Sequence, residues 1–158
     1  MLHDEHNALF TLAADFIRYT NRSVFLTGRA GTGKTTFLKY IRAETIKQTA
    51  VVAPTGVAAI NAGGVTIHSF FQLPFAPYMP ESKGFEKNEN AVDRHHLLGR
   101  IKMNRDRIKV LQQLELLIID EISMVRCDVL DAIDLVLRHF RYRYHEPFGV
   151  CRCCLLAI

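Results

Sequence analysis

The sequence predicts an α/β fold in which a parallel β-sheet is covered by helices on both faces. Three short aliphatic runs are candidates for buried strands, and they lie at residues 23–27, 50–53 and 116–120. Segments with apolar residues at helical spacing alternate with these runs. Strands that are apolar on both faces and alternate with helices are typical of parallel sheets. With 158 residues, the chain has the length of about one domain.

The composition narrows the class of protein. Hydrophobic residues make up 49% of the chain and charged residues 23%, which excludes a disordered or collagen-like protein. No apolar run approaches the roughly 20 residues of a membrane-spanning helix, and residues 1–6 are polar and acidic, unlike a signal peptide. We therefore expect a soluble intracellular protein without a membrane partner. Its formal net charge of +4 is compatible with an anionic partner.

The first half of the chain contains two of the strands and three helices. Residues 7–19 carry apolar side chains every three or four positions, which predicts an amphipathic helix. A glycine-rich turn follows the first strand and leads into a helix from about residue 34 to 47. The second strand stops at residues 54–56, and the short helix after it ends at Gly63 and Gly64, a helix C-terminal signal.

The second half begins with a long irregular segment. From about residue 72 to 96, three prolines and a polar run predict a surface excursion. A basic helical stretch is expected over residues 100–114, before the third strand. Residues 129–140 then show the spacing of another amphipathic helix.

Residues 28–35 fit the phosphate-loop pattern G-x-x-x-x-G-K-[ST] at every fixed position, between a predicted strand and a predicted helix. Glycines let successive backbone N–H groups converge on phosphates, and the helix presents its positive N-terminus to them. Lys34 can reach the β- and γ-phosphates of ATP, and the Thr35 hydroxyl can ligate Mg²⁺. We predict nucleotide contacts from Gly28, Ala30, Gly31, Thr32, Gly33, Lys34, Thr35 and Thr36.

Two adjacent carboxylates follow the third aliphatic run. Asp120 would hold Mg²⁺ together with Thr35, and Glu121 would orient or deprotonate the attacking water. The alternative is that Asp120 only caps a helix after a core strand. Beside a phosphate loop, the pair points to hydrolysis rather than to nucleotide binding alone, with Lys34, Asp120 and Glu121 as the catalytic residues.

Further motifs accompany the phosphate loop at residues 52–64, 66–71, 118–125 and 147–149. Together with the loop they resemble the Pif-one family of ATP-dependent DNA helicases, the B branch of superfamily one. The resemblance implies a RecA-like lobe over residues 1–149, the first of two lobes in a 5′-to-3′ motor. It further implies ATP bound between the lobes, single-stranded DNA across both, and roles in DNA repair, recombination or telomere maintenance.

The segment from residue 54 to 71 corresponds to the family's motif that grips the DNA backbone. The resemblance implies DNA contacts from Pro54, Thr55, Gly56, Thr66, His68 and Ser69. Such donors on loops near the carboxyl end of a sheet can contact phosphates. The alternative is an ordinary strand, turn and helix with a glycine cap.

The sequence departs from the family in two respects. Many relatives carry a glutamine near the N-terminus that reads adenine, and here the matching residue is His6. The chain also stops before a second lobe with its arginine finger. We therefore expect the 158 residues alone to be inactive in unwinding.

Residues 138–145 interleave basic and aromatic side chains, a mixture that can stack bases and neutralise phosphates. The alternative, which we favour, is the polar end of a helix where cations complement the helix dipole.

The last segment, residues 150–158, is cysteine-rich and is expected to be an aberrant tail outside the lobe. Relatives would continue Pro-Phe-Gly-Gly-Val-Gln, an apolar strand and Ile-Gly-Asp. The loss of one base near the Gly149 codon would convert such a strand into this tail, and would place Arg152 in a strand buried on both faces. The alternatives are a genuine metal or redox tail and an arbitrary end.

Two other functions compete with a helicase lobe. One is a module that binds nucleotide and DNA without turnover, and the other is a different phosphate-loop enzyme such as a nucleotide kinase. Glu121 argues against the first. The second would need an acceptor pocket and lid arginines, for which the sequence gives no sign.

Overall fold

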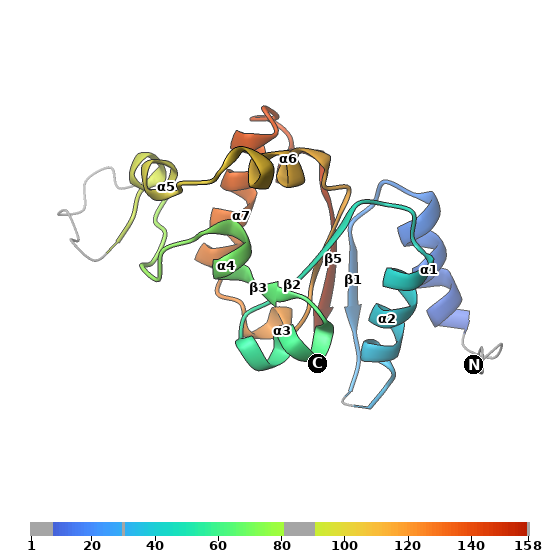
Figure 1. Cartoon of the computed structure of the whole chain (residues 1–158). Helices are drawn as coiled ribbons and strands as arrows, with labels where there is room; N and C mark the ends of the chain where they lie inside the picture. The colour runs from blue at the N-terminus through green and yellow to red at the C-terminus, as the bar shows by residue number, and fades with distance from the viewer. Residues whose placement is uncertain (1–7, 30, 81–90, 158) are drawn as a thin grey trace.

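The computed structural model describes residues 8–29, 31–80 and 91–157, and its centre is a five-stranded parallel sheet (Figure 1). The strands occur in the order β1-β5-β4-β2-β3. Their bounds are Val24–Thr27 for β1, Arg152–Ala157 for β5, Leu116–Ile119 for β4, Thr49–Ala53 for β2 and Val65–Thr66 for β3. The three predicted strands are therefore confirmed as β1, β2 and β4.

Helices cover both faces of the sheet, as the sequence predicts. One face packs against α1 (Ala8–Tyr19) and α2 (Lys34–Glu44), where Phe37 and Ile41 meet Ile118 in one apolar cluster. The other face packs against the longest described helix, α7 (Cys127–Phe140), with α4 (Ile67–Phe71), α5 (Arg94–Arg100) and α6 (Arg105–Gln113) beside it (Figure 1). The remaining elements are α3 (Gly56–Ala62), η1 (Ile122–Met124) and η2 (Pro147–Val150).

The predicted basic helix over residues 100–114 is wrong at its start, because the helix in this region, α6, begins only at Arg105. Helix α5 ends at Arg100, and the buried side chain of Ile101 follows it. Asn104 then begins α6, where its side-chain oxygen accepts a hydrogen bond from the Arg107 backbone N–H at 2.9 Å. An asparagine in this position is a strong helix N-cap, which explains the break.

The predicted helix over residues 34–47 ends earlier, at Glu44. Thr45 adopts extended backbone angles, and its hydroxyl accepts a hydrogen bond from the Lys47 backbone N–H. This local bond competes with continuation of the helix.

The C-terminal segment is part of the sheet. β5 pairs with β1 on one side and with β4 on the other, so it fills a central position. A boundary after Gly149 therefore does not separate a tail from the lobe. The idea that a lost base produced this segment concerns the gene, and it stays a prediction to be tested by reading the DNA around the Gly149 codon.

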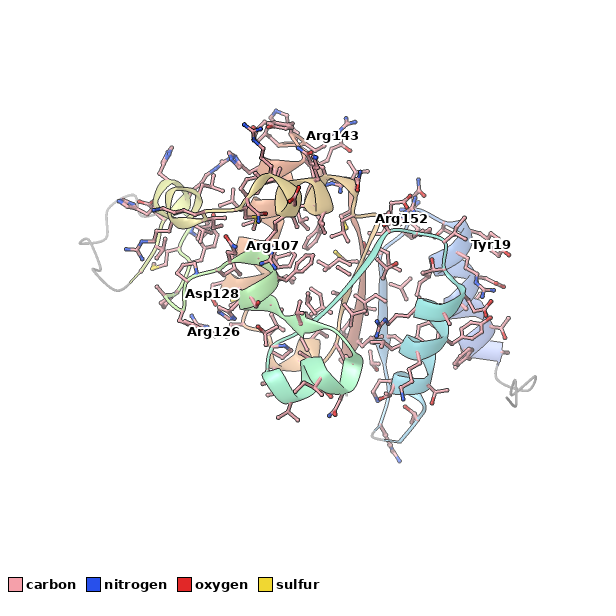
Figure 2. All side chains as sticks on the ribbon, viewed as in Figure 1. Tyr19, Arg107, Arg126, Asp128, Arg143 and Arg152 are labelled. Atoms are coloured by element: carbon pink, nitrogen blue, oxygen red, sulfur yellow. The ribbon has the colours of Figure 1, made fainter. Side chains whose placement is uncertain are left out.

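Arg152 does not lie unpaired in the core, contrary to the expectation for a shifted strand. It begins β5 at the amino edge of the sheet, remains partly exposed, and donates a hydrogen bond to the Asn21 side-chain oxygen (Figure 2). The apolar interior of the strand comes from residues such as Cys153 and Leu156, both nearly inaccessible to solvent. Reduced cysteine behaves as a small hydrophobic residue, so it suits this position.

The thiols of Cys127 and Cys151 are expected to react very differently. Cys127 is exposed, whereas Cys151 is buried, and burial raises the pKa of its thiol from 9.0 to about 11. Since only the thiolate is nucleophilic, iodoacetamide at pH 8.5 should alkylate Cys127 and spare Cys151 in the folded chain, as read by peptide mass mapping. Because the folded pKa exceeds the unfolded one, stability should also fall as the pH rises from about 9 to about 11. Equal labelling of both residues would contradict the buried position of Cys151, just before β5.

Candidate nucleotide-binding and DNA-binding site

The phosphate loop connects β1 to α2 at the carboxyl edge of the sheet. Gly31 and Gly33 have φ angles of 79° and 88°, a left-handed conformation that glycine adopts without strain. A side chain at Gly28 would approach Thr32 Oγ1 to 2.8 Å, so any larger residue here would displace the Thr32 hydroxyl. Alternation of left-handed and right-handed backbone is the geometry of an anion-binding concavity. The loop therefore has the shape that a phosphate site needs.

Lys34 is the first residue of α2, and its ammonium group lies within the loop. Nζ donates hydrogen bonds to the backbone oxygens of Gly28 at 2.5 Å and Arg29 at 2.8 Å. Thr35 and Thr36 follow in the first helical turn and are exposed. The predicted contact at Ala30 lies outside the described residues. One positive charge is thus held by the loop at the start of a helix, where anions are favoured.

Asp120 and Glu121 follow β4 at the same edge. Burial raises the pKa of the Asp120 carboxyl, while the Glu121 backbone N–H and the Lys34 charge oppose that rise. β1 and β4 are parallel and both pair with β5, so the phosphate loop and this carboxylate lie at the same edge of the sheet. The Asp120 Oδ1 atom also accepts a hydrogen bond from the Glu121 N–H at 3.0 Å, which fixes the carboxylate.

Glu121 has an uncommon backbone conformation, with φ 54° and ψ 44°. A residue with a Cβ is strained in this left-handed region, and such strain concentrates at functional sites. The conformation directs the chain from β4 into η1 and places two carboxylates in succession at the strand end. These oxygens and the Thr35 hydroxyl are hard ligands of the kind that Mg²⁺ prefers, so the residues present fit a magnesium nucleotide.

The segment from Pro54 to Ser69 leaves the same edge of the sheet. Thr55 caps α3 by accepting a hydrogen bond from the Ala58 N–H, and Thr66 caps α4 by accepting one from the Ser69 N–H. Both threonines therefore act as helix caps, as expected if this segment is an ordinary strand, turn and helix. Each hydroxyl keeps its proton, which remains available for donation to a phosphate.

His68 and Ser69 lie on α4, after the edge strand β3. Burial lowers the pKa of the His68 imidazole, and the Asp128 carboxylate opposes that shift. The Ser69 backbone oxygen accepts a hydrogen bond from the Arg107 guanidinium at 2.7 Å. The His68 ring stacks on Phe75, with centroids 4.8 Å apart and planes at 15°. Sequence reasoning missed Phe75 and Arg107, because both contacts join segments with no shared motif.

In the basic and aromatic segment at residues 138–145, Arg138 and Arg141 make contacts that stabilise the fold. The Arg141 guanidinium donates to four backbone oxygens, those of Leu111, Gln112, Leu114 and Gly149. Arg138 pairs with Asp134 at 2.7 Å. The four contacts of Arg141 join the end of α6 to η2. Arg141 therefore provides donors for carbonyls at the C-terminus of α6 that have no partner within that helix. These contacts support the interpretation as the end of a helix.

Replacing Arg141 by alanine is expected to lower the free energy of unfolding by about 2–3 kcal/mol, because several partly buried carbonyls lose a charged donor. Urea denaturation of the 158-residue chain would measure the loss. Arg143→Ala is the matched control, since the Arg143 side chain is exposed and its guanidinium pairs with the exposed Glu146 carboxylate at 3.4 Å. That variant should change stability by about 0.5 kcal/mol or less. Equal effects of the two substitutions would show that the carbonyl contacts are unimportant.

Among the described helices, none is long and apolar enough to cross a membrane. His6, at the position of the adenine-reading glutamine, lies outside the described residues.

Comparison with known proteins supports the resemblance. The model of the family described as PIF1-like helicase matches residues 1–155. Curated relatives include an ATP-dependent DNA helicase PIF1 of Saccharomyces cerevisiae, 32% identical over 94% of this chain, and an ATP-dependent DNA helicase Pif1 of Psychrobacter, 37% identical over 87% of it. The chain spans 16% and 19% of their respective lengths.

Solved structures agree with this match. A Pif1 helicase from Bacteroides in complex with ADP-AlF3 and single-stranded DNA aligns with 99% of this chain at a TM-score of 0.80 and 42% identity. A Pif1 helicase from Candida albicans aligns with the same share at a TM-score of 0.71 and 31% identity. In each case the chain covers 32% of the solved chain. With a phosphate loop, a carboxylate pair and this fold in one lobe, the chain belongs to the PIF1-like helicase family.

Proposed function

We propose that this chain is the first RecA-like motor lobe of a 5′-to-3′ DNA helicase that couples ATP hydrolysis to movement along single-stranded DNA. The observation that carries the proposal is geometric: the phosphate loop follows β1 and the Asp120–Glu121 pair follows β4, at the same carboxyl edge of the parallel sheet. The segment with Thr55 and Thr66 leaves that same edge. The relatives named above, and the solved complex with a nucleotide analogue and single-stranded DNA, support the proposal.

In this proposal each residue has a defined task. The backbone N–H groups of residues 28–36 and the Lys34 ammonium group bind the phosphates. Thr35 and Asp120 would hold Mg²⁺, which supplies charge neutralisation at the β- and γ-phosphates when bound. Glu121 orients the attacking water and accepts its proton.

The DNA-binding part of the proposal rests on the polar groups after β2 and β3. The Thr55 and Thr66 hydroxyls, with His68 and Ser69, would contact the DNA backbone, while Pro54 and Gly56 shape the turn. Such contacts fix the position of the strand without reading its sequence. Work in DNA repair, recombination or telomere maintenance is the cellular role that this activity suggests.

A second lobe, outside these 158 residues, would complete the motor. The chain spans about a third of the solved Pif1 chains that it matches, which supports this part of the proposal. A second lobe would close over the nucleotide and contribute an arginine to the γ-phosphate.

The 158-residue chain is therefore expected to show no unwinding and at most trace ATP hydrolysis. An arginine finger increases the rate by about 10³–10⁵ in related NTPases, and this lobe would lack it. A strand-displacement assay with a 5′-tailed duplex checks the prediction. Displacement by the purified chain, abolished by Lys34→Ala so that it cannot come from a contaminant, would refute the proposal of a two-lobe motor.

The remaining candidate is a module that binds nucleotide and DNA without turnover. The strained Glu121 argues against it, since binding alone does not require a carboxylate in that position.

A further inference from the structure

Phe75 is an exposed aromatic residue whose ring stacks on the imidazole of His68. Its relative exposure is 90%, and one face of the ring lies against His68, with centroids 4.8 Å apart and planes at 15°. His68 is half-buried on α4 and anchors the contact. We call these two residues the His68–Phe75 pair. The second face of the Phe75 ring is therefore presented to solvent as a flat apolar surface.

Arginine side chains flank the pair. The Arg107 guanidinium of α6 contacts the Ser69 backbone oxygen, next to His68. Arg126 lies beside Asp128, whose carboxylate accepts a hydrogen bond from the Tyr78 backbone N–H, three residues after Phe75 (Figure 2). Arg126 is largely exposed, and its side chain is held by hydrogen bonds of 2.9 and 2.8 Å to that carboxylate. The Arg107 guanidinium therefore lies one residue from His68, and the Arg126 guanidinium lies there as an ion pair with the Asp128 carboxylate.

This arrangement suits one kind of ligand better than others. A nucleobase has a planar π-face that stacks on an aromatic ring, and its chain carries phosphates that guanidinium groups attract. An apolar peptide would use the ring but not the arginines, and a free phosphate would use the arginines but not the ring. Stacking is also independent of base identity, as a translocating motor requires.

We propose that the His68–Phe75 pair stacks one base of the bound single strand, with Arg107 and Arg126 beside the neighbouring phosphates. The inference deepens the proposed function and rests on it. Phe75 belongs to none of the motifs that the sequence analysis identified. It adds a base contact to a segment that is otherwise expected to contact the sugar–phosphate backbone.

The first test compares a dT12 oligonucleotide with a 12-residue abasic strand by fluorescence anisotropy. The chain is expected to bind dT12 more tightly than the abasic strand. Phe75→Ala should weaken dT12 binding by about 10-fold to 100-fold, the usual value of one base stack, and should leave abasic binding unchanged. Phe75→Tyr, which keeps the ring, should retain the affinity of the original chain. Ile46→Ala is the matched control, since Ile46 is 97% exposed and lies before β2, away from the carboxyl edge.

The second test uses the absence of tryptophan from the sequence. Phe75→Trp creates a single tryptophan at the pair, and its emission, excited selectively over that of the tyrosines, should be quenched by dT12 but not by the abasic strand. Ile46→Trp should respond to neither.

The outcomes separate the two proposals. If the original chain binds neither strand, the DNA part of the proposed function fails and the inference fails with it. If the chain binds dT12 and Phe75→Ala binds it equally well, with no quenching of the Phe75→Trp emission, only the inference is overturned. Equal weakening of dT12 and abasic binding by Phe75→Ala would also overturn the inference, because the ring would then contribute to contacts with the sugar–phosphate backbone and not with a base.

Discussion

Replacing Lys34 by alanine is expected to weaken the binding of MgATP to the chain by at least about 100-fold. Charged hydrogen bonds contribute about 1.5–3 kcal/mol each, and the lysine can direct two of them at the phosphates. Its ammonium group already lies within the loop, bonded to the Gly28 and Arg29 oxygens, so binding requires only that it exchange these partners. Isothermal titration calorimetry, or displacement of a fluorescent nucleotide, would measure the affinity.

Lys39→Ala is the matched control for this prediction. Lys39 lies on the same helix and is exposed, so its removal takes the same charge from the chain without touching the loop. Its affinity for MgATP should stay within about twofold of the original, because a distant exposed charge is largely screened. If both variants bind MgATP like the original chain, the loop is not the nucleotide site.

Glu121→Gln is expected to reduce ATP hydrolysis by at least about 100-fold while leaving the affinity for MgATP nearly unchanged. General base catalysis contributes about 10²–10⁴ to a rate, and glutamine keeps the size of the side chain but cannot accept the proton. Because the chain alone should hydrolyse ATP slowly, the measurement is a single-turnover assay with the protein in excess over labelled ATP.

Glu115→Gln provides the comparison. Glu115 lies just before the amino end of β4, whereas Glu121 follows the carboxyl end of that strand. The Glu115 carboxylate accepts a hydrogen bond from the Gln48 N–H, and glutamine retains that acceptor. The rate of this variant should equal that of the original chain. Should Glu121→Gln hydrolyse ATP as fast as Glu115→Gln, Glu121 has no part in the chemistry and a module without turnover becomes the better description.

The sheet and the phosphate loop could be predicted from the sequence because their signals are local. The strand before Asp120 is a run of four aliphatic residues, and the loop is a contiguous motif. β5 gave no such signal, because it begins with Arg152 and Cys153 and directly follows Cys151, which is not the composition of a buried strand. In the structure, the cysteines act as small apolar residues and Arg152 stays at the partly exposed edge. The identity of each residue therefore mattered less than its position in the sheet.

The remaining features depend on contacts between distant segments. Arg141 reaches carbonyls about 30 positions away, and no pattern within its own helix indicates that. The stacking of His68 on Phe75 likewise depends on how the chain returns after α4. The break between α5 and α6 is different: Asn104 caps α6 through a local hydrogen bond, whereas the basic residues on both sides of it favour one continuous helix.

The proposal that the chain is one half of a two-lobe motor is tested most directly by ATP hydrolysis, with and without single-stranded DNA. The 158-residue chain would be compared with a longer protein that joins the same lobe to a second RecA-like lobe. The longer protein is expected to hydrolyse ATP at least about 10³-fold faster than the chain and to be stimulated by DNA, because a second lobe supplies the arginine finger and the rest of the DNA track. The chain alone should show trace hydrolysis that DNA does not change. Rapid, DNA-stimulated hydrolysis by the chain alone would contradict the proposal, and so would a longer protein no faster than the chain.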